Sequence, residues 1–384
     1  MELTDISVPL RELINVVTLA VSLMFALFLF NARFRKLPES MFLIIALLVM
    51  ASVKLDQLYQ MLDGWTKAPE YGFALAPLQW LMTPSLYFFV RAKTTATFAL
   101  RARDSMHLLP FLISVLYFSM VYYSLPLPEK TALLQSGWLG STGNRVVIPV
   151  AGDIFQLTYL YAALRLLQDH GIRLRDWFSS VEKREFRWLK RILILWAAIF
   201  LFHLGLISFA VLGANLRNVL VILDVMNLMH LAIAIALPAS AISDYFERVT
   251  VADIAPIRPR SPLIAEEERQ AFHGRLSTFM ASKKPYLHAD LSLKKLAGDL
   301  AMTPRELSEV INTESNKNFF EFINSYRVIE AKRLLREKPE IRILDVAFAA
   351  GFNSKSAFND AFKKQTGMAP SAFRSQAAQQ EKTS

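Results

Sequence analysis

The sequence predicts an all-α protein with two parts: a seven-helix transmembrane bundle, followed by a soluble domain with two helix-turn-helix units. Apolar residues make up 53% of the 384 residues. In the first part they gather in runs long enough to cross a membrane. The last third carries dense charged clusters and a repeated pattern of helix caps and apolar faces. We therefore expect one part in lipid and one in water.

Seven apolar runs are candidates for membrane-spanning helices. Each has the length that roughly 30 Å of hydrocarbon requires at about 1.5 Å per residue. We expect the spans at 13–30, 41–62, 71–90, 108–124, 146–167, 192–212 and 219–245. Glu2, Asp5 and Glu12 around the first run favour an uncleaved anchor over a signal peptide. Residues 1–245 are thus expected to form a seven-helix membrane bundle that senses a signal.

The loops between these spans differ in their positive charge. Alternate loops hold 15 lysine and arginine residues on one side of the membrane and 5 on the other. Positively charged loops stay in the cytoplasm. The split therefore predicts an N-terminus outside and, after seven crossings, a cytoplasmic C-terminal domain.

Several polar side chains fall inside the predicted spans, where a charge is costly to bury. At about 1.5 Å per residue they form a layer roughly 9–12 Å below the outer face. The layer comprises Lys54, Asp56, Gln79, Asp153, His203 and Asp224. One interpretation is a buried ion pair between Lys54 and Asp153 or Asp224, and the other is a ligand pocket.

Composition excludes several classes of function. The sequence has no cysteine, which excludes disulfides, thiolate metal sites and cysteine catalysis. The soluble segments contain no nucleophile with a base, no phosphate loop and no metal motif, so we predict neither an enzyme nor a metal or other cofactor. A net charge of +10 favours nucleic acid or anionic lipid as a partner.

The chain changes character after residue 245. Pro256, Pro259 and Pro262 predict an extended, proline-rich linker over 246–263. We expect an amphipathic helix at 264–283, a compact helical domain at 284–376 and a disordered tail at 377–384. The charged loop 171–187 is expected in the cytoplasm, where it either signals or lies on the inner leaflet.

Two helix-turn-helix patterns lie at about 293–312 and 343–364, joined by a long helix at 319–336. In the first pattern Thr303 is a good N-cap and Pro304 suits the first helical position. Asn353 stands 50 residues after Thr303, in the corresponding place of the second pattern. The two patterns therefore predict two similar units in one domain.

These residues resemble the DNA-binding domain of the AraC family of bacterial transcription regulators, also called AraC/XylS-type, from about Tyr286 to Arg374. The densest segments are 324–327 (NSYR), 330–335 (EAKRLL), 343–347 (ILDVA), 351–354 (GFNS) and 358–370 (FNDAFKKQTGMAP). Ala301 departs from the family, which usually has glycine in the first turn. A left-handed alanine there costs about 1 kcal/mol.

The resemblance implies that two recognition helices enter successive major grooves, roughly 34 Å apart. Arginine and lysine suit guanine and asparagine suits adenine, so the base contacts are expected from Arg305, Asn312, Lys355 and Asn359. Helix starts and flanks suit phosphate, which points to Thr303, Asn353, Ser354, Lys363 and Lys364. Ser308 and Ser356 complete the predicted DNA-binding set on the exposed faces.

Other charged side chains nearby have two interpretations. The acidic Glu306 and Glu309 are also expected to be exposed, but they repel phosphate and favour a solvated face. On the joining helix Arg327, Lys332, Arg333 and Arg336 are either surface charges or phosphate contacts.

The predicted function is a membrane-bound one-component transcription regulator in a bacterial cytoplasmic (inner) membrane. It binds DNA sequence-specifically and is controlled by a signal sensed in the bundle. Expected partners are double-stranded promoter DNA, the lipid bilayer, RNA polymerase, an unidentified small-molecule or membrane signal, and a second copy of the chain. The alternative is a transporter or channel with a regulatory DNA- or protein-binding cytoplasmic domain. The intramembrane charges support this alternative.

Overall fold

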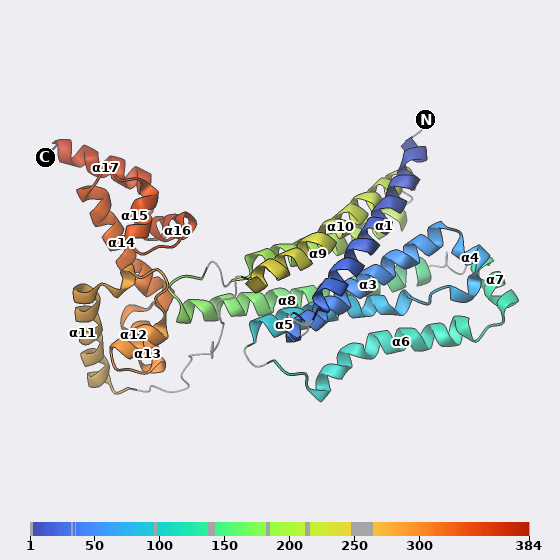
Figure 1. Cartoon of the computed structure of the whole chain (residues 1–384), viewed down its shortest axis with the longest axis horizontal. Helices are drawn as coiled ribbons and strands as arrows, with labels where there is room; N and C mark the ends of the chain where they lie inside the picture. Colours follow the sequence, from blue (N-terminus) through green and yellow to red (C-terminus); the bar gives the residue numbers. More distant parts are fainter. Residues whose placement is uncertain are drawn as a thin grey trace. The chain divides into compact units, whose positions relative to one another are not determined.

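The computed structural model describes residues 3–31, 34, 36–95, 98–136, 143–181, 185–211, 216–246 and 264–383. Every regular element in these ranges is a helix (Figure 1), which confirms the predicted all-α fold. The chain divides into an N-terminal unit, residues 1–167 with 186–250, and a C-terminal unit, residues 168–185 with 251–384. The last part of α8 (Ile148–Trp177) and the loop after it thus belong with the C-terminal unit, which the sequence did not predict.

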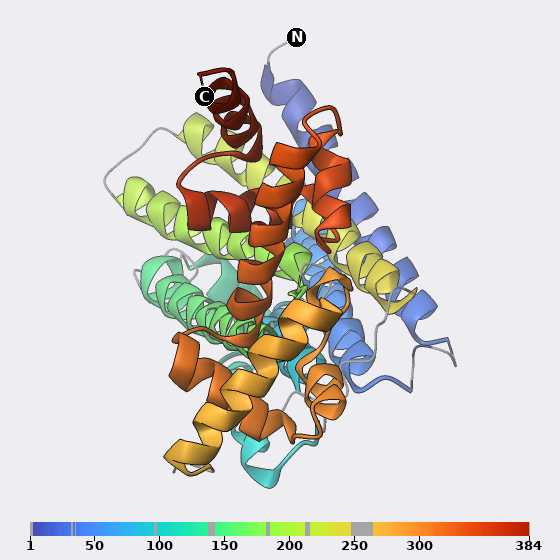
Figure 2. The same cartoon turned by 90° about the vertical axis from the view of Figure 1, so that its left-hand side faces the viewer.

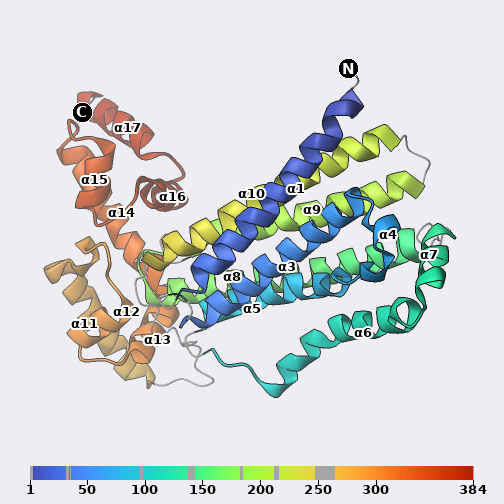
Figure 3. The same ribbon diagram turned by 45° about the vertical axis from the view of Figure 1, so that its right-hand side comes forward.

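The N-terminal unit is built from long helices that run side by side (Figure 3). They are α1 (Leu3–Leu29), α3 (Pro38–Met61), α5 (Met82–Thr94), α6 (Leu109–Phe118), α8 (Ile148–Trp177), α9 (Arg187–Val211) and α10 (Leu216–Phe246), with shorter helices α4 (Gly64–Lys67) and α7 (Leu127–Gln135). Helix α3 packs against α1 and α5, and α10 packs against α1 and α9. Their common core includes Leu47, Leu86, Trp196 and Ile233.

Six stretches of the described residues are long and apolar enough to cross a membrane. They are Leu10–Leu29, Pro38–Met61, Pro69–Thr94, Ala102–Tyr123, Arg187–Ser208 and Asp224–Asp244, and they coincide with six of the seven predicted spans. The span predicted at 146–167 forms α8, which is not among the six. Polar residues lower the hydropathy of α8, although Asp153 and Gln156 are buried.

The C-terminal unit contains two small apolar cores on one connecting helix. Its elements are α11 (Glu266–Lys283), α12 (Leu293–Asp299), α13 (Pro304–Ser315), α14 (Phe319–Glu337), α15 (Ile343–Ala349), α16 (Lys355–Thr366) and α17 (Pro370–Thr383). The first core joins α11, α12 and α13 around Leu276 and Leu307, and the second joins α15 and α16 around Val346 and Phe358. Helix α14 contributes to both cores and carries one at each end (Figure 2).

Two predicted segments lie outside the cores. One differs from the structure, and the other lies almost entirely outside the described residues. The tail predicted to be disordered at 377–384 is helical as far as Thr383, because α17 begins with Pro370 and continues through good helix formers without glycine or proline. The linker predicted at 246–263 lies outside the described residues, except for Phe246 at the end of α10.

The turns of the two helix-turn-helix units have the same backbone geometry. The Met302 amide donates to the Ala297 carbonyl at 2.9 Å, and the Phe352 amide donates to the Ala347 carbonyl at 3.0 Å. The residue before each amide is left-handed, with φ of 54° at Ala301 and 91° at Gly351. The left-handed alanine expected at position 301 is therefore confirmed.

The two turns tolerate a Cβ differently. Ala301 already carries one and bears only the conformational cost of the left-handed region. At Gly351 a Cβ would lie 2.4 Å from the Tyr286 carbonyl oxygen and 2.8 Å from the Leu287 Cα. Because both of these atoms belong to the backbone, the second turn requires glycine for its packing as well as for its φ.

We predict opposite effects of exchanging alanine and glycine at these turns. Ala301→Gly should stabilise the C-terminal unit by about 1 kcal/mol, because it relieves the left-handed alanine. Gly351→Ala should destabilise it by more than about 2 kcal/mol, since a backbone clash adds to the same cost. Both changes in stability can be measured by heating the full chain in lipid nanodiscs and detecting the unfolding of the C-terminal unit by its susceptibility to proteolysis. Equal shifts of the same sign would contradict this account.

Candidate DNA interface

The first candidate recognition helix, α13, begins with a reciprocal cap. The Thr303 hydroxyl accepts the Glu306 amide at 3.3 Å, and the Glu306 carboxylate accepts the Thr303 amide at 2.7 Å. This capping box satisfies two amides that a helix start leaves without partners. It also explains an acidic residue beside the predicted phosphate contact, because Glu306 stabilises the helix start that presents Arg305.

Helix α13 exposes fewer side chains than the sequence predicted. Arg305 and Asn312 are exposed, as expected. Ser308 and Glu309 were expected on the same face, but they are only 5% and 7% exposed. The prediction of their exposure was wrong because α13 packs against three helices, α11, α12 and α14. The Asn312 amide also donates to the Ser308 hydroxyl at 3.2 Å, so this serine supports Asn312.

The second candidate recognition helix, α16, starts with Ser354 as its N-cap. Its hydroxyl accepts the Ala357 amide at 3.1 Å, which leaves the predicted phosphate contact at the helix start intact. Phe358 and Phe362 are fully buried and hold the helix on its core. Lys355, Ser356, Lys363 and Lys364 are exposed and Asn359 is half-buried. The predicted polar face therefore exists on α16.

Two of the predicted phosphate contacts already have protein partners. The Lys364 ammonium lies 2.7 Å from the Glu321 carboxylate, and this hydrogen bond lowers the pKa of Glu321. The Asn353 amide donates to the hydroxyl of Ser180, a residue far away in the sequence. DNA would have to compete with the second contact, whereas Lys364 is 72% exposed and can also face a phosphate.

Arg327 was predicted to be a surface charge or a phosphate contact, and it is neither. Its side chain is 1% exposed. The guanidinium donates to the backbone carbonyls of Tyr286 at 2.8 Å, His288 at 2.9 Å and Ser179 at 3.0 Å, and it lies over the Phe352 ring at 5.7 Å. Arg327 therefore connects α14 to the segment before α12, to the loop after α8 and to the turn before α16. The helical period could have indicated its burial, because Arg327 stands four residues after the buried Ile323 and four before the buried Ala331.

The predicted intramembrane layer separates into several local contacts. Arg11 pairs with Asp224 at 2.6 Å, and His203 contacts Asp153 at 2.7 Å. The pairing predicted between Lys54 and an aspartate is wrong, because these aspartates have closer partners. Arg11 was not included in the predicted layer because it precedes the predicted span. It lies within α1, which begins earlier, at Leu3.

The remaining members of the layer are Lys54, Asp56 and Gln79, and each lies in different surroundings. Lys54 is 2% exposed and donates to the side-chain oxygens of Asn227 at 2.6 Å and Gln57 at 3.0 Å. Asp56 accepts from the Gln60 amide at 2.7 Å, and the Gln79 side chain is exposed. The structure therefore does not gather the six residues of the layer around one pocket.

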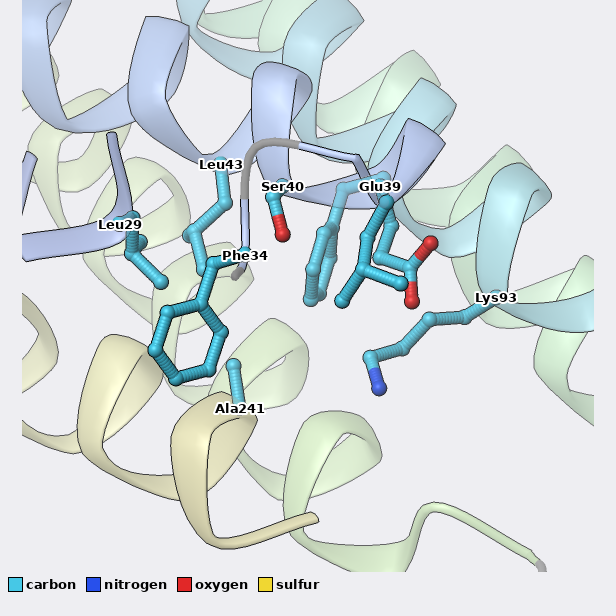
Figure 4. Close-up of a pocket in the computed structure, with 9 residues that line it drawn as sticks. Leu29, Phe34, Glu39, Ser40, Leu43, Lys93 and Ala241 are labelled. Atoms are coloured by element: carbon cyan, nitrogen blue, oxygen red, sulfur yellow. The ribbon is translucent and has the colours of Figure 1, made fainter. Parts of the chain in front are cut away.

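A small pocket lies elsewhere in the N-terminal unit (Figure 4). It is lined by Leu29, Phe34, Leu37, Glu39, Ser40, Leu43, Phe89, Lys93 and Ala241. Lys93 forms an ion pair with Asp244, and its ammonium lies 5.1 Å from the centre of the Phe186 ring. No group of three histidine or acidic side chains suited to a metal occurs in the part of the chain that the structure describes.

Comparisons with known proteins match the C-terminal region. Residues 296–376 match the family described as a helix-turn-helix domain. The HTH-type transcriptional regulator GlxA of Rhizobium meliloti is 26% identical over 152 residues, which are 39% of this chain and 46% of that protein. The uncharacterized transcriptional regulatory protein YesN of Bacillus subtilis is 31% identical over 87 residues, which are 22% of this chain and 24% of that protein. The chain thus spans less than half the length of either relative.

A solved structure is also similar to part of this chain. The C-terminal domain of AraT, a response regulator from Geobacillus stearothermophilus, is 27% identical, with 31% of this chain and 88% of that chain covered and a TM-score of 0.23. The family match over residues 296–376 includes the hydrogen-bonded turns of both units. Residues 296–376 of this chain therefore form a helix-turn-helix domain of the AraC type.

Proposed function

We propose that the protein is a membrane-bound transcription regulator that binds promoter DNA through its two helix-turn-helix units. The observation that carries the proposal is one helix, α14, holding two units whose turns have the same hydrogen bond and a left-handed residue at the same position. Two recognition helices held in one rigid domain suit two successive major grooves. The names of the two relatives, both transcriptional regulators, support this reading.

The exposed polar residues divide by the part of DNA that they suit. Arg305 and Asn312 on α13, and Lys355 on α16, are exposed and have the side chains that read guanine or adenine in the major groove. Lys363 and Lys364 on the same helix suit phosphate, which adds affinity without sequence information. This division lets binding and specificity be tested separately.

The direct test is selection of genomic DNA fragments by the full chain in lipid nanodiscs. We expect a few fragments to bind at least about a thousandfold more tightly than random DNA, and binding to weaken as salt rises. Equal binding of all fragments would contradict specific regulation. Binding that does not respond to salt would contradict the phosphate contacts.

We predict distinct effects of two substitutions on the selected fragments. Arg305→Ala should weaken binding about tenfold to a hundredfold and relax the preference for one base, because it removes a groove contact. Lys363→Ala should weaken binding to selected and random DNA alike and reduce the salt slope by about 1. Lys283→Ala, an exposed lysine at the end of α11, serves as the matched control and should change neither. Loss of base preference in the Lys363 variant would contradict the division.

The N-terminal unit supports a place in the membrane. Large apolar side chains are exposed along its helices, including Leu27, Ile113, Met120 and Leu201. Such a surface is unfavourable in water and suits hydrocarbon. We infer seven crossings rather than six, since α8 has 30 residues, about 45 Å of helix, and its Asp153 and Gln156 are buried.

The number of crossings predicts where the N-terminus lies. Seven crossings with a cytoplasmic C-terminal unit place it outside, in agreement with the distribution of lysine and arginine among the loops. Six crossings would place both termini in the cytoplasm. A reporter enzyme that is active only outside the cytoplasm, fused before Met1, should therefore be active. The same reporter fused after Ser384 should be inactive, and an inactive N-terminal fusion that is still expressed would contradict seven crossings.

We infer that the bundle senses the signal and that its charged contacts hold its helices in register. Asp224→Leu should destabilise the bundle by on the order of 3 kcal/mol, because it leaves the Arg11 guanidinium without its ion-pair partner in a partly buried site. Arg11→Leu combined with Asp224→Leu should recover most of that loss. Thermal stability in nanodiscs measures both variants. If the double variant were no more stable than the single one, the pair would not act as a packing contact.

A further inference from the structure

The loop after α8 forms part of the C-terminal unit. We call its residues Trp177–Val181 the strap. The strap begins with the last residue of α8, a helix that starts at Ile148 in the N-terminal unit, and α9 of the N-terminal unit begins soon after it, at Arg187. Arg175 and Glu185, on either side of the strap, are joined by an ion pair at 3.2 Å. Both residues belong to the C-terminal unit, and the strap is joined through the chain to α8 on one side and to α9 on the other.

The strap docks like a short β-strand. Phe178 forms an antiparallel bridge with Ser292, and the Ser179 amide donates to the Leu291 carbonyl at 3.1 Å. The Ser179 hydroxyl donates to the same carbonyl at 2.7 Å, and Trp177 packs against the core of the first helix-turn-helix. Ser179, Ser180 and Val181 are 2%, 4% and 2% exposed. The strap is thus buried in the domain.

One contact of the strap reaches the centre of the domain. The Arg327 guanidinium donates to the Ser179 carbonyl at 3.0 Å and to its hydroxyl at 3.1 Å. Arg327 stands in α14, between the part of this helix that packs on the first core and the part that packs on the second. Withdrawal of Ser179 would leave two hydrogen bonds of a buried guanidinium unmade. The position of the strap is therefore coupled to the helix that spaces the two units.

The next strap residue reaches the candidate DNA interface. The Asn353 amide donates to the Ser180 hydroxyl. Asn353 lies in the turn before α16, immediately before the N-cap Ser354, where backbone and side-chain donors suit a phosphate. Ser180 occupies one of the two N–H donors of this amide and fixes its direction, so this donor is not available to a DNA phosphate while the strap is docked.

We propose that the strap is an autoinhibitory segment: docked, it withholds one N–H donor of Asn353 from DNA and fixes α14, and its withdrawal by α8 and α9 releases the domain to bind. The proposal rests on the proposed function and adds a route for regulation. A signal that displaces the end of either helix pulls on residues that contact both Arg327 and Asn353. The covalent connection at both ends makes the strap a direct mechanical link to the N-terminal unit.

The first test compares variants of the full chain in nanodiscs, with the DNA fragments selected by the wild-type protein. Ser180→Ala removes only the competing hydroxyl and should tighten DNA binding about fivefold, as expected for one hydrogen bond made available to phosphate. Asn353→Ala should abolish this gain when the two substitutions are combined, since the gain depends on the Asn353 amide. Ser282→Ala, whose hydroxyl bonds only within α11, is the matched control and should leave the affinity unchanged.

The second test holds the strap in place chemically. The chain has no cysteine, so Phe178→Cys with Ser292→Cys introduces a single pair. Facing residues of an antiparallel pair have Cα atoms about 4.5–5.5 Å apart, within the range of a disulfide. The oxidised form should bind the selected DNA at least about fivefold more weakly than the same variant after reduction.

The outcomes separate the two proposals. If the wild-type chain selects no DNA, both the proposed function and the strap proposal fail. If it selects DNA, but Ser180→Ala and the oxidised disulfide each stay within about twofold of their references, the strap proposal alone is overturned. Tighter binding in the oxidised form would also overturn it, since the docked strap would then assist DNA binding.

Discussion

The guanidinium of Arg327 is the contact on which the arrangement of the C-terminal unit depends. It is buried between the two helix-turn-helix units, where it donates to the carbonyls of Tyr286, His288 and Ser179 and lies over the Phe352 ring. A buried charge is tolerated only when its hydrogen bonds are made. The segments that supply these carbonyls are therefore held close to α14. Two recognition helices need such a fixed frame in order to fit a fixed groove spacing.

The N-terminal unit follows the same physical rule at several separate places. Arg11 meets Asp224, His203 meets Asp153, and Lys54 meets Asn227. Each polar group has a partner on another helix, which is what the low dielectric of a bundle interior demands. These contacts join α1 and α3 to α10, and α8 to α9.

The sequence predicted the features that are local or periodic. Thr303 and Ser354 were predicted at helix starts and act as N-caps, and Ala301 was expected to be left-handed and is. Apolar faces located both cores, because buried positions repeat with the helical period. The exposed polar faces of α13 and α16 could be predicted for the same reason, with Ser308 and Glu309 as exceptions, since helix packing covers them.

The features that the sequence did not predict depend on contacts between distant segments. Ser179 and Arg327 are 148 residues apart, and neither shows a periodic signal that pairs them. Lys54 was assigned the wrong partner because the charges in the spans do not specify which helices are neighbours. The start of α1 brought Arg11 to Asp224, and that boundary could not be inferred from the apolar run alone.

The central claim is that one chain places two recognition helices in adjacent grooves of a specific DNA site. Hydroxyl-radical footprinting of a selected genomic fragment, with the full chain in lipid nanodiscs, tests it most directly. The account predicts two protected windows on one face of the duplex, about 10 base pairs apart from centre to centre. A single protected window, or uniform protection along the fragment, would contradict it.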